Sequence, residues 1–380
     1  MTRWVDGLNS AGVAAGIKPS SELDLGLLVA DRPVTWAGTF TRNAAAAECV
    51  NWNRSVLGRP ARALIVNSGN ANACTGGGGR ITVEATAAAA ADAVGCDVEE
   101  VLVCSTGPIG VPLDARLIEA ALPAAARSLA PEVDGFSRSI LTTDTFPKVS
   151  TWTSDGASIT GVAKGAAMIA PNMATMLAFV GTDAEVPANA LQEATDWAVD
   201  RSFNRLWLDG CESTNDSVFV LATGRGPELA SRELRAGLLQ VCSELALKMA
   251  RDAEGATKLV RINVEGATSV AAAVELGRAV AGSDLWKAAA HGADPNWGRV
   301  LAAMGAVDRQ LDIQTTSVAI GDELLFDKGE PCGRLGAAAA AMRADEFSVS
   351  VTLDRGDGAA EVLTSDLSEE YVTLNAEVTT

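Results

Sequence analysis

The spacing of apolar and polar residues predicts strands and helices mixed along the whole chain. Short apolar runs bounded by turn formers indicate strands, and longer segments with apolar residues every three or four positions indicate helices. Strands are expected at 34–40, 62–66, 100–104, 217–222, 259–264 and 371–375. Helices are expected at 80–95, 187–203, 230–253, 267–282 and 334–344. The turn residues Ser154-Asp155-Gly156 predict a hairpin after a polar segment at 139–145.

Composition narrows the class of protein and of substrate. A chain of 380 residues, 48% of them hydrophobic, is long enough for two domains or lobes. Its net charge of −18 disfavours nucleic acid and anionic membranes as partners and favours a small-molecule substrate. The first residues lack the apolar core of a signal peptide, and we expect a cytoplasmic protein without a membrane span. An anionic substrate would need local positive charge.

Cysteine and histidine usage argues against metal sites and disulfides. The seven cysteines are scattered, odd in number and without C-x-x-C spacing, which is typical of reduced thiols. His291 is the only histidine, so a metal site with several histidines is excluded and a Ser-His-Asp site would have to use it. We expect a structural role for His291 and no metal or organic cofactor.

The stretch from Lys164 to Phe179 carries the most specific chemistry. Pro171-Asn172 predicts a turn, and the apolar run after Thr175 predicts a strand, so the Thr175 hydroxyl should stand where a loop enters a strand. An N-terminal threonine can act as a nucleophile with its own α-amine as base, because that amine titrates near pH ~8. The chain would have to be cut between Ala174 and Thr175. From periodicity alone, a structural threonine is the more common explanation.

Two glycine-containing loops follow predicted strands. Asn67 to Gly76 is crowded with turn formers, and Ser105-Thr106-Gly107-Pro108-Ile109-Gly110 comes directly after the strand at 100–104. Such a turn can point backbone N–H groups at one spot, which a developing oxyanion requires. An ordinary strand-to-helix turn is the alternative. Further polar segments lie at 209–217, 252–258 and 291–299.

Together these segments resemble the ornithine acetyltransferase family, the bifunctional glutamate N-acetyltransferases. The resemblance runs from about residue 67 to the end, and the Asp252 to Lys258 segment matches without a substitution. It implies a layered α/β fold, related to self-processing aminopeptidases, that is cut into an α chain (1–174) and a β chain (175–380). The two chains share one active site. The β chain carries the nucleophile and a substrate-binding C-terminal tail, and the α chain carries the oxyanion-hole and substrate loops.

The resemblance also implies a role for individual residues. Thr175 would be the nucleophile, and Thr106 and Gly107 would form the oxyanion hole. The implied substrate-binding residues are Thr142, Thr143, Lys164, Glu254, Asn375 and Thr380.

The implied reaction is a ping-pong transfer of acetyl from N-acetylornithine to glutamate through an acetyl-threonine, most simply in arginine biosynthesis. The resemblance leaves open acetyl-CoA as a second donor, and it implies an α2β2 assembly. Alternatives are a self-processing amidohydrolase or aminopeptidase, and an uncleaved or specialised-metabolism paralogue. The chain departs from the family motifs at Leu141, Ala167, Cys211 and Glu212.

The intact mass under denaturing conditions tests the expected cut. We expect two chains that meet at Ala174 and Thr175. A single chain of 39.0 kDa would contradict self-processing and favour the paralogue.

Overall fold

The computed structural model describes residues 1–170 and 176–377, which form two compact units. Among the described residues, the first unit lies within 1–204 and 211–249, and the second comprises 205–210 and 250–377. The two units confirm the expectation of two domains or lobes. The expected division into an α chain (1–174) and a β chain (175–380) does not coincide with the boundary between the two units, because both chains contribute residues to the first unit. That division stays a prediction.

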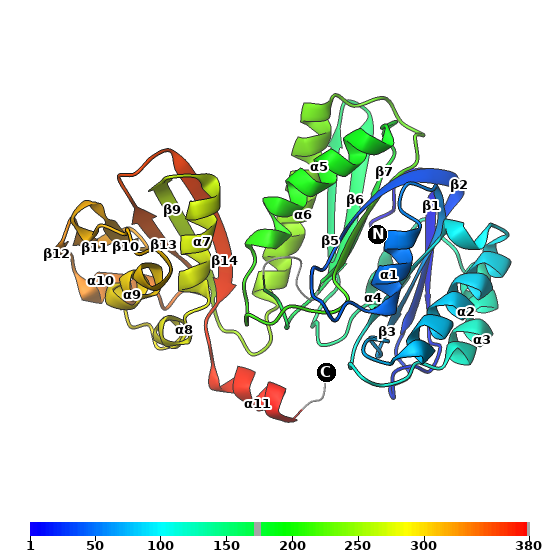
Figure 1. Cartoon of the computed structure of the whole chain (residues 1–380), viewed down its shortest axis with the longest axis horizontal. Coiled ribbons are helices and arrows are strands. Elements are labelled where there is room, and N and C mark those ends of the chain that lie inside the picture. Colours follow the sequence, from blue (N-terminus) through cyan, green and yellow to red (C-terminus); the bar gives the residue numbers. More distant parts are fainter. Residues whose placement is uncertain (171–175, 378–380) are drawn as a thin grey trace. The chain divides into compact units, whose positions relative to one another are not determined.

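The first unit is built on an eight-stranded sheet (Figure 1). Its strands lie in the order β4-β3-β2-β8-β7-β6-β5, with β1 paired to β2. Their bounds are β1 Leu8–Val13, β2 Leu25–Phe40, β3 Ala61–Ser68, β4 Val101–Thr106, β5 Lys148–Ser154, β6 Ala157–Lys164, β7 Leu177–Thr182 and β8 Ser217–Ala222.

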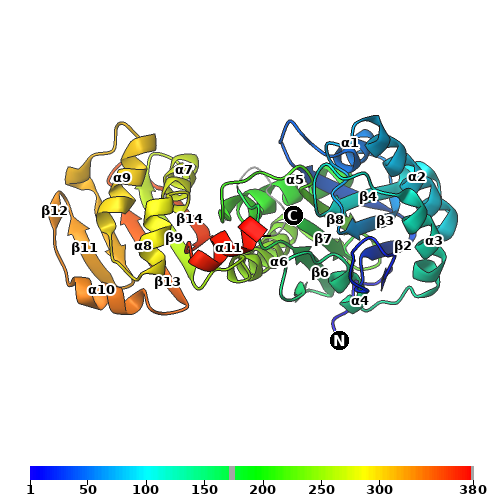
Figure 2. The ribbon, with the colours of Figure 1, turned by 90° about the horizontal axis from the view of Figure 1, so that it is seen from below.

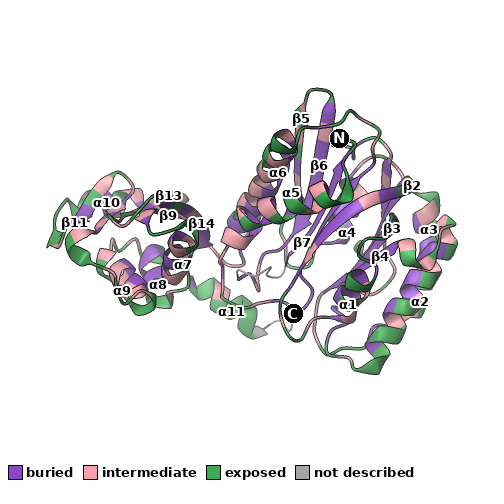
Figure 3. Cartoon of the chain, turned by 45° about the horizontal axis from the view of Figure 1, so that its top comes forward, coloured by how far each residue is buried: buried purple, intermediate pink, exposed green. Residues whose placement is uncertain are grey.

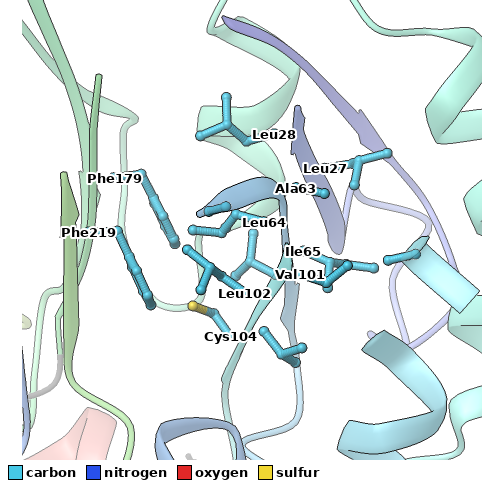
Figure 4. Close-up of a cluster of buried hydrophobic side chains, with 14 of the residues drawn as sticks. Leu27, Leu28, Ala63, Leu64, Ile65, Val101, Leu102, Cys104, Phe179 and Phe219 are labelled. Atoms are coloured by element: carbon cyan, nitrogen blue, oxygen red, sulfur yellow. The ribbon is translucent and has the colours of Figure 1, made fainter. Parts of the chain in front are cut away.

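Strand β2 divides this sheet into two halves. Its residues 25–29 pair with β1 and β3, whereas residues 35–40 pair with β8. Asp31, Arg32 and Pro33, which lie between these two segments, are exposed. The two halves face each other across the main core, in which Phe179 and Phe219 oppose leucines of the other half (Figure 4).

Helices cover the outer faces of both halves, so the first unit has helix, sheet, sheet and helix layers. Figures 1 and 2 show α2 and α3 beside β1 to β4, and α5 and α6 beside β5 to β8. The strands are largely buried and the outer helix faces are exposed (Figure 3). The helix bounds are α1 Glu48–Ser55, α2 Gly77–Val94, α3 Ala115–Arg127, α4 Asp134–Ser139, α5 Ala188–Asp200 and α6 Ser231–Arg251. The α/β class implied by the sequence is confirmed.

The two sides of the expected cut pair with each other in the sheet. β6 and β7 are antiparallel, with Lys164 opposite Leu177, and β7 runs parallel to β8. Residues 35–40 of β2 also pair with β8. Strands from 1–174 and from 175–380 therefore hydrogen-bond to one another along their length.

The second unit contains a six-stranded sheet in the order β12-β11-β10-β13-β9-β14. Strands β9 and β13 are parallel, and the other neighbours are antiparallel. The strands are β9 Leu259–Ala267, β10 Ser317–Ile320, β11 Glu323–Asp327, β12 Glu330–Pro331, β13 Glu346–Thr352 and β14 Gly358–Ser365. The helices are α7 Val270–Ala281, α8 Asp284–His291, α9 Trp297–Val307, α10 Leu335–Ala341 and α11 Glu369–Glu377. No helix in the described part of the chain has the length and apolar character needed to cross a bilayer.

The predicted strand at 371–375 is wrong, because these residues belong to helix α11. The alternation of Val372 and Leu374 with polar residues suggested a strand, but Val372 is 59% exposed and no buried face forms. The Ser368 hydroxyl accepts the Tyr371 N–H at 3.0 Å and thereby caps the helix. The acidic residues Glu369 and Glu370 in its first turn complement the helix dipole.

The predicted hairpin and the other predicted helices and strands are confirmed within a few residues. The pattern missed β1 and the first half of β2 in the glycine- and alanine-rich region before residue 34, and it also missed α1, α3, α4, α8 and α9.

Replacing Phe219 by alanine should destabilise the first unit strongly. Its buried ring stacks on Phe179 with the ring centroids 5.9 Å apart. We expect the free energy of unfolding in a denaturant titration to fall by ~3–5 kcal/mol. As a control, Leu57→Ala at an exposed position should change it by less than ~0.5 kcal/mol. Equal effects of the two variants would contradict the proposed core.

Candidate active site

Thr106 and Gly107 lie where β4 meets the Asn67 to Gly76 loop. The Thr106 carbonyl accepts the Asn70 N–H at 3.0 Å. Gly107 has φ +139°, and a Cβ there would come within 2.4 Å of the Asn70 nitrogen. Only glycine fits such a close backbone approach. The two glycine-containing loops singled out in the sequence are therefore in direct contact.

Asn215 connects these two loops to a third. Its side-chain Nδ2 donates to the Ala71 carbonyl at 2.7 Å and to the Ser105 carbonyl at 2.9 Å. The Ser105 hydroxyl in turn donates to Asn67 Oδ1 at 2.7 Å. Asn215 is buried and stands two residues before β8. The polar segment at 209–217 was noted in the sequence, but this residue was not singled out within it.

Lys164 is the last residue of β6 and reaches the end of β4. Its Nζ donates to Thr106 Oγ1 at 3.0 Å, and both residues are buried. Because the ammonium uses an acceptor position of the hydroxyl, the Thr106 hydroxyl proton can point to another acceptor. The structure thus brings together a predicted substrate-binding lysine and a predicted oxyanion-hole threonine.

Asp144 balances the lysines in this region. Its Oδ1 lies 2.6 Å from Lys148 Nζ and accepts the Gly165 N–H at 2.6 Å. Burial raises the pKa of Asp144, but Lys164, Lys148 and the Gly165 N–H outweigh it and hold this pKa below its ordinary value. Two buried lysines therefore surround one ionised carboxylate. This provides the local positive charge that an anionic substrate would need.

Asp216 holds the residue that follows Thr175. Its Oδ1 accepts the Met176 N–H at 2.9 Å. Its Oδ2 is buried and has no hydrogen-bond partner among the described residues. Burial raises the pKa of Asp216 well above its ordinary value, although the Met176 N–H, the Ser213 side chain and Lys164 oppose this shift.

Pro171, Asn172, Ala174 and Thr175 lie outside the described residues, so the expected turn, cut and nucleophile stay predictions. β7 begins at Leu177, two residues after Thr175, as the apolar run predicts.

Thr142 and Thr143 are exposed in the segment between α4 and β5. They directly precede Asp144, whose Oδ2 accepts the Thr142 N–H at 3.3 Å. Both threonines therefore belong to the same unit as Lys164 and Thr106.

Glu254 and Asn375 are neighbours in the second unit. Asn375 Nδ2 donates to Glu254 Oε2 at 3.1 Å. Glu254 Oε1 is buried and has no hydrogen-bond partner in the described part of the chain. A carboxylate oxygen in this position is suited to an ammonium group, because a buried oxygen without a donor is costly. Thr380 lies outside the described residues.

The polar segment at 291–299 begins with His291, which belongs to a different cluster of the second unit. His291 Nδ1 lies 2.7 Å from Asp366 Oδ2. Asp366 was not singled out in the sequence, because it belongs to no quoted segment. The residues that the structure describes contain no group of three or more histidine, cysteine, aspartate or glutamate side chains arranged to hold a metal ion.

Comparison with known proteins identifies close relatives. A model of the ArgJ family matches residues 9–380. The Arginine biosynthesis bifunctional protein ArgJ of Thermus thermophilus is 44% identical and covers 98% of both chains. The protein of the same name from Brucella melitensis is 40% identical over 98% of this chain and 95% of its own. A crystal structure of Arginine biosynthesis bifunctional protein argJ from Bacillus halodurans matches with a TM-score of 0.51 and 36% identity, over 53% of this chain and 98% of that chain.

Asp144→Asn should destabilise the first unit in a pH-dependent way. At pH 7 the variant leaves the fully buried Lys148 without its counter-charge, which should cost ~3–5 kcal/mol in unfolding free energy. Because the folded-state pKa of Asp144 is lowered, its stabilisation is complete above the unfolded value of ~3.9 and is lost as the pH falls through the folded value. The difference between wild type and variant should therefore shrink below about pH 4.

Denaturant titrations at pH 7 and pH 3 measure this difference. Asp134→Asn is the control, because Asp134 pairs with Arg138 on the exposed surface and should contribute less than ~0.5 kcal/mol. A pH-independent loss in Asp144→Asn would show that the ion pair is not its cause.

Proposed function

Because the chain belongs to the ArgJ family, we propose that it transfers the acetyl group of N-acetylornithine to glutamate in arginine biosynthesis. One observation carries this proposal beyond the family match. The dipeptide Asn215-Asp216 binds the Ser105 carbonyl next to Thr106 at the end of β4 and also the peptide N–H of Met176, the residue next to Thr175. A nucleophile at Thr175 would therefore be tethered close to the proposed oxyanion hole.

The proposed nucleophile arises by self-cleavage. The Thr175 hydroxyl attacks the Ala174 carbonyl carbon and displaces its own nitrogen, which takes up a proton. Water then hydrolyses the ester and leaves an Ala174 carboxylate and a free Thr175 α-amine. The matched Bacillus halodurans chain corresponds to 53% of this one, and this length supports a cut near the middle.

Acetyl transfer then proceeds in two half-reactions. The Thr175 hydroxyl attacks the acetyl carbonyl of N-acetylornithine while its α-amine takes the hydroxyl proton and passes it to the leaving ornithine nitrogen. The amine of glutamate next attacks the acetyl ester and restores the hydroxyl. Thr106 Oγ1–H and the Gly107 N–H stabilise the oxyanion in both steps, and each such donor is typically worth ~10²–10³ in kcat.

We also assign individual side chains to the amino-acid groups of the substrates. Lys164 binds carboxylate, because it adds positive charge to a region with one ionised aspartate. Glu254 binds ammonium through Oε1, which accepts no hydrogen bond from a described residue. We assign further substrate contacts to Thr142, Thr143, Asn375 and Thr380.

We propose that the processed chains stay together as an α2β2 assembly in the cytoplasm. Pairing of β7 and β8 with strands before residue 174 supports the αβ association. The relatives are named bifunctional, which supports a second acetyl donor, and we propose acetyl-CoA for this role.

Replacing Thr175 by alanine should abolish both self-cleavage and acetyl transfer, because the same hydroxyl performs both. Intact mass and N-acetylglutamate formation from N-acetylornithine and glutamate measure the two effects. The control Thr153→Ala, at an exposed position of β5, should leave both unchanged. A cleaved or active Thr175→Ala variant would refute the assignment.

The same mixture separates transfer from hydrolysis. We expect N-acetylglutamate and ornithine in equal amounts. Free acetate without N-acetylglutamate would instead indicate an amidohydrolase.

A further inference from the structure

Asp366 binds one short loop of the second unit from several sides. Its Oδ1 accepts the backbone N–H groups of Thr257 and Lys258, each at 2.9 Å. Its Oδ2 accepts the Thr257 hydroxyl at 2.6 Å and lies 2.7 Å from His291 Nδ1. The Asp366 side chain is fully buried. This one carboxylate therefore fixes the backbone of the loop 252–258, which carries Glu254.

The segment after Asp366 holds the same loop at a second point. The Ser368 hydroxyl donates to the Gly255 carbonyl and accepts the Tyr371 N–H. Gly255 has φ +62°, and a Cβ there would lie 2.4 Å from the Tyr371 nitrogen. The first turn of α11 thus packs directly on the residue next to Glu254. Asn375, one turn further along, donates to Glu254 Oε2 and to the Tyr371 carbonyl.

Charge explains why an aspartate suits this position. Burial raises the pKa of Asp366, but hydrogen bonds from the Thr257 hydroxyl, His291 and the two backbone N–H groups outweigh this effect. The pKa therefore lies below its ordinary value, and the carboxylate is ionised. Lys258 Nζ donates to the carbonyls of Ala290 and His291 at the end of α8. The loop is thereby joined to α8 through Lys258 as well as through the His291 ring.

We propose that Asp366 is a positioning residue for substrate binding, because it fixes the loop that presents Glu254. The inference rests on the proposed function, in which Glu254 binds the substrate ammonium. Asp366 touches no substrate. It determines where Glu254 Oε1, which accepts no hydrogen bond from the described residues, lies relative to α11 and Asn375. A displaced carboxylate weakens binding of the ground state and of the transition state alike, which raises KM and leaves kcat nearly unchanged.

Asp366→Asn tests the role with the least change of shape. The amide keeps one oxygen for the two backbone donors but presents an NH2 group to the Thr257 hydroxyl and to His291. We expect KM for N-acetylornithine to rise on the order of 10-fold, with kcat and the fraction of self-cleaved chain close to wild type. Loss of folded protein alone would lower the apparent kcat and leave KM unchanged.

Thr257 provides a second, milder pair of variants in case Asp366→Asn does not fold. Thr257→Val removes one hydroxyl donor to Asp366 without changing the side-chain volume, and we expect a KM increase of a few-fold. Thr257→Ser keeps the donor and should restore the wild-type KM. The control Asp308→Asn removes a carboxylate of the same unit that binds Arg355 and the Gln310 N–H, and it should leave KM unchanged.

A double-mutant cycle distinguishes the failure of the inference from the failure of the proposed function. Glu254→Gln should raise KM by itself, and adding Asp366→Asn should then raise KM less than ~2-fold further, because both act through one carboxylate. If the KM increases of the two single variants instead multiply in the double variant, the positioning role of Asp366 is overturned. An unchanged KM in Glu254→Gln would instead refute the proposed role of Glu254.

Amide hydrogen exchange tests the loop without relying on activity. Exchange at residues 254–258 should accelerate about 10-fold in Asp366→Asn and should be unchanged in Asp308→Asn. Unchanged exchange in Asp366→Asn would overturn the inference even if acetyl transfer is active.

Discussion

The side-chain amide of Asn215 donates two hydrogen bonds inside the first unit, to the carbonyls of Ala71 and Ser105. The Ala71 carbonyl lies in the Asn67 to Gly76 loop, the Ser105 carbonyl lies at the end of β4, and the amide comes from the segment before β8. Because Asn215 is buried, solvent cannot readily replace the bonds, and each carbonyl left without a donor would cost ~1–3 kcal/mol. The three segments are therefore fixed relative to one another before any ligand arrives, as catalysis by preoriented dipoles requires.

The pKa values of two carboxyl groups near Lys164 are shifted in opposite directions by their surroundings. Asp144 contacts Lys148 and the Gly165 N–H and stays ionised. Asp216 is buried, has one oxygen without a hydrogen-bond partner among the described residues, and burial raises its pKa well above the ordinary value. Around Asp144, two buried lysines accompany one ionised carboxylate. The sign of this local charge differs from that of the net charge of −18 of the whole chain.

The sequence pattern predicts helices and strands whose formation depends on neighbouring residues, and it fails where contacts between distant residues decide. The run at 217–222 is apolar on both faces, and its strand has the predicted bounds. The segment 371–375 has a strand-like alternation, but the cap at Ser368 and the absence of a sheet partner decide for a helix. The family resemblance pointed to Thr106 and Lys164, and the fold brings Lys164 Nζ within 3.0 Å of Thr106 Oγ1. Sequence motifs could not reveal Asp366, because its partner Thr257 is 109 residues away and only the fold joins them.

The pairing of β6 with β7 and of β2 with β8 has a consequence for the lifetime of the protein. A single chain that unfolds can regain this sheet by a reaction within one molecule. After a cut between residues 174 and 175, the same sheet needs two separate polypeptides to meet, so its recovery depends on protein concentration. The processed molecule would then survive through the height of its unfolding barrier, because each complete unfolding event would be difficult to reverse in a dilute solution.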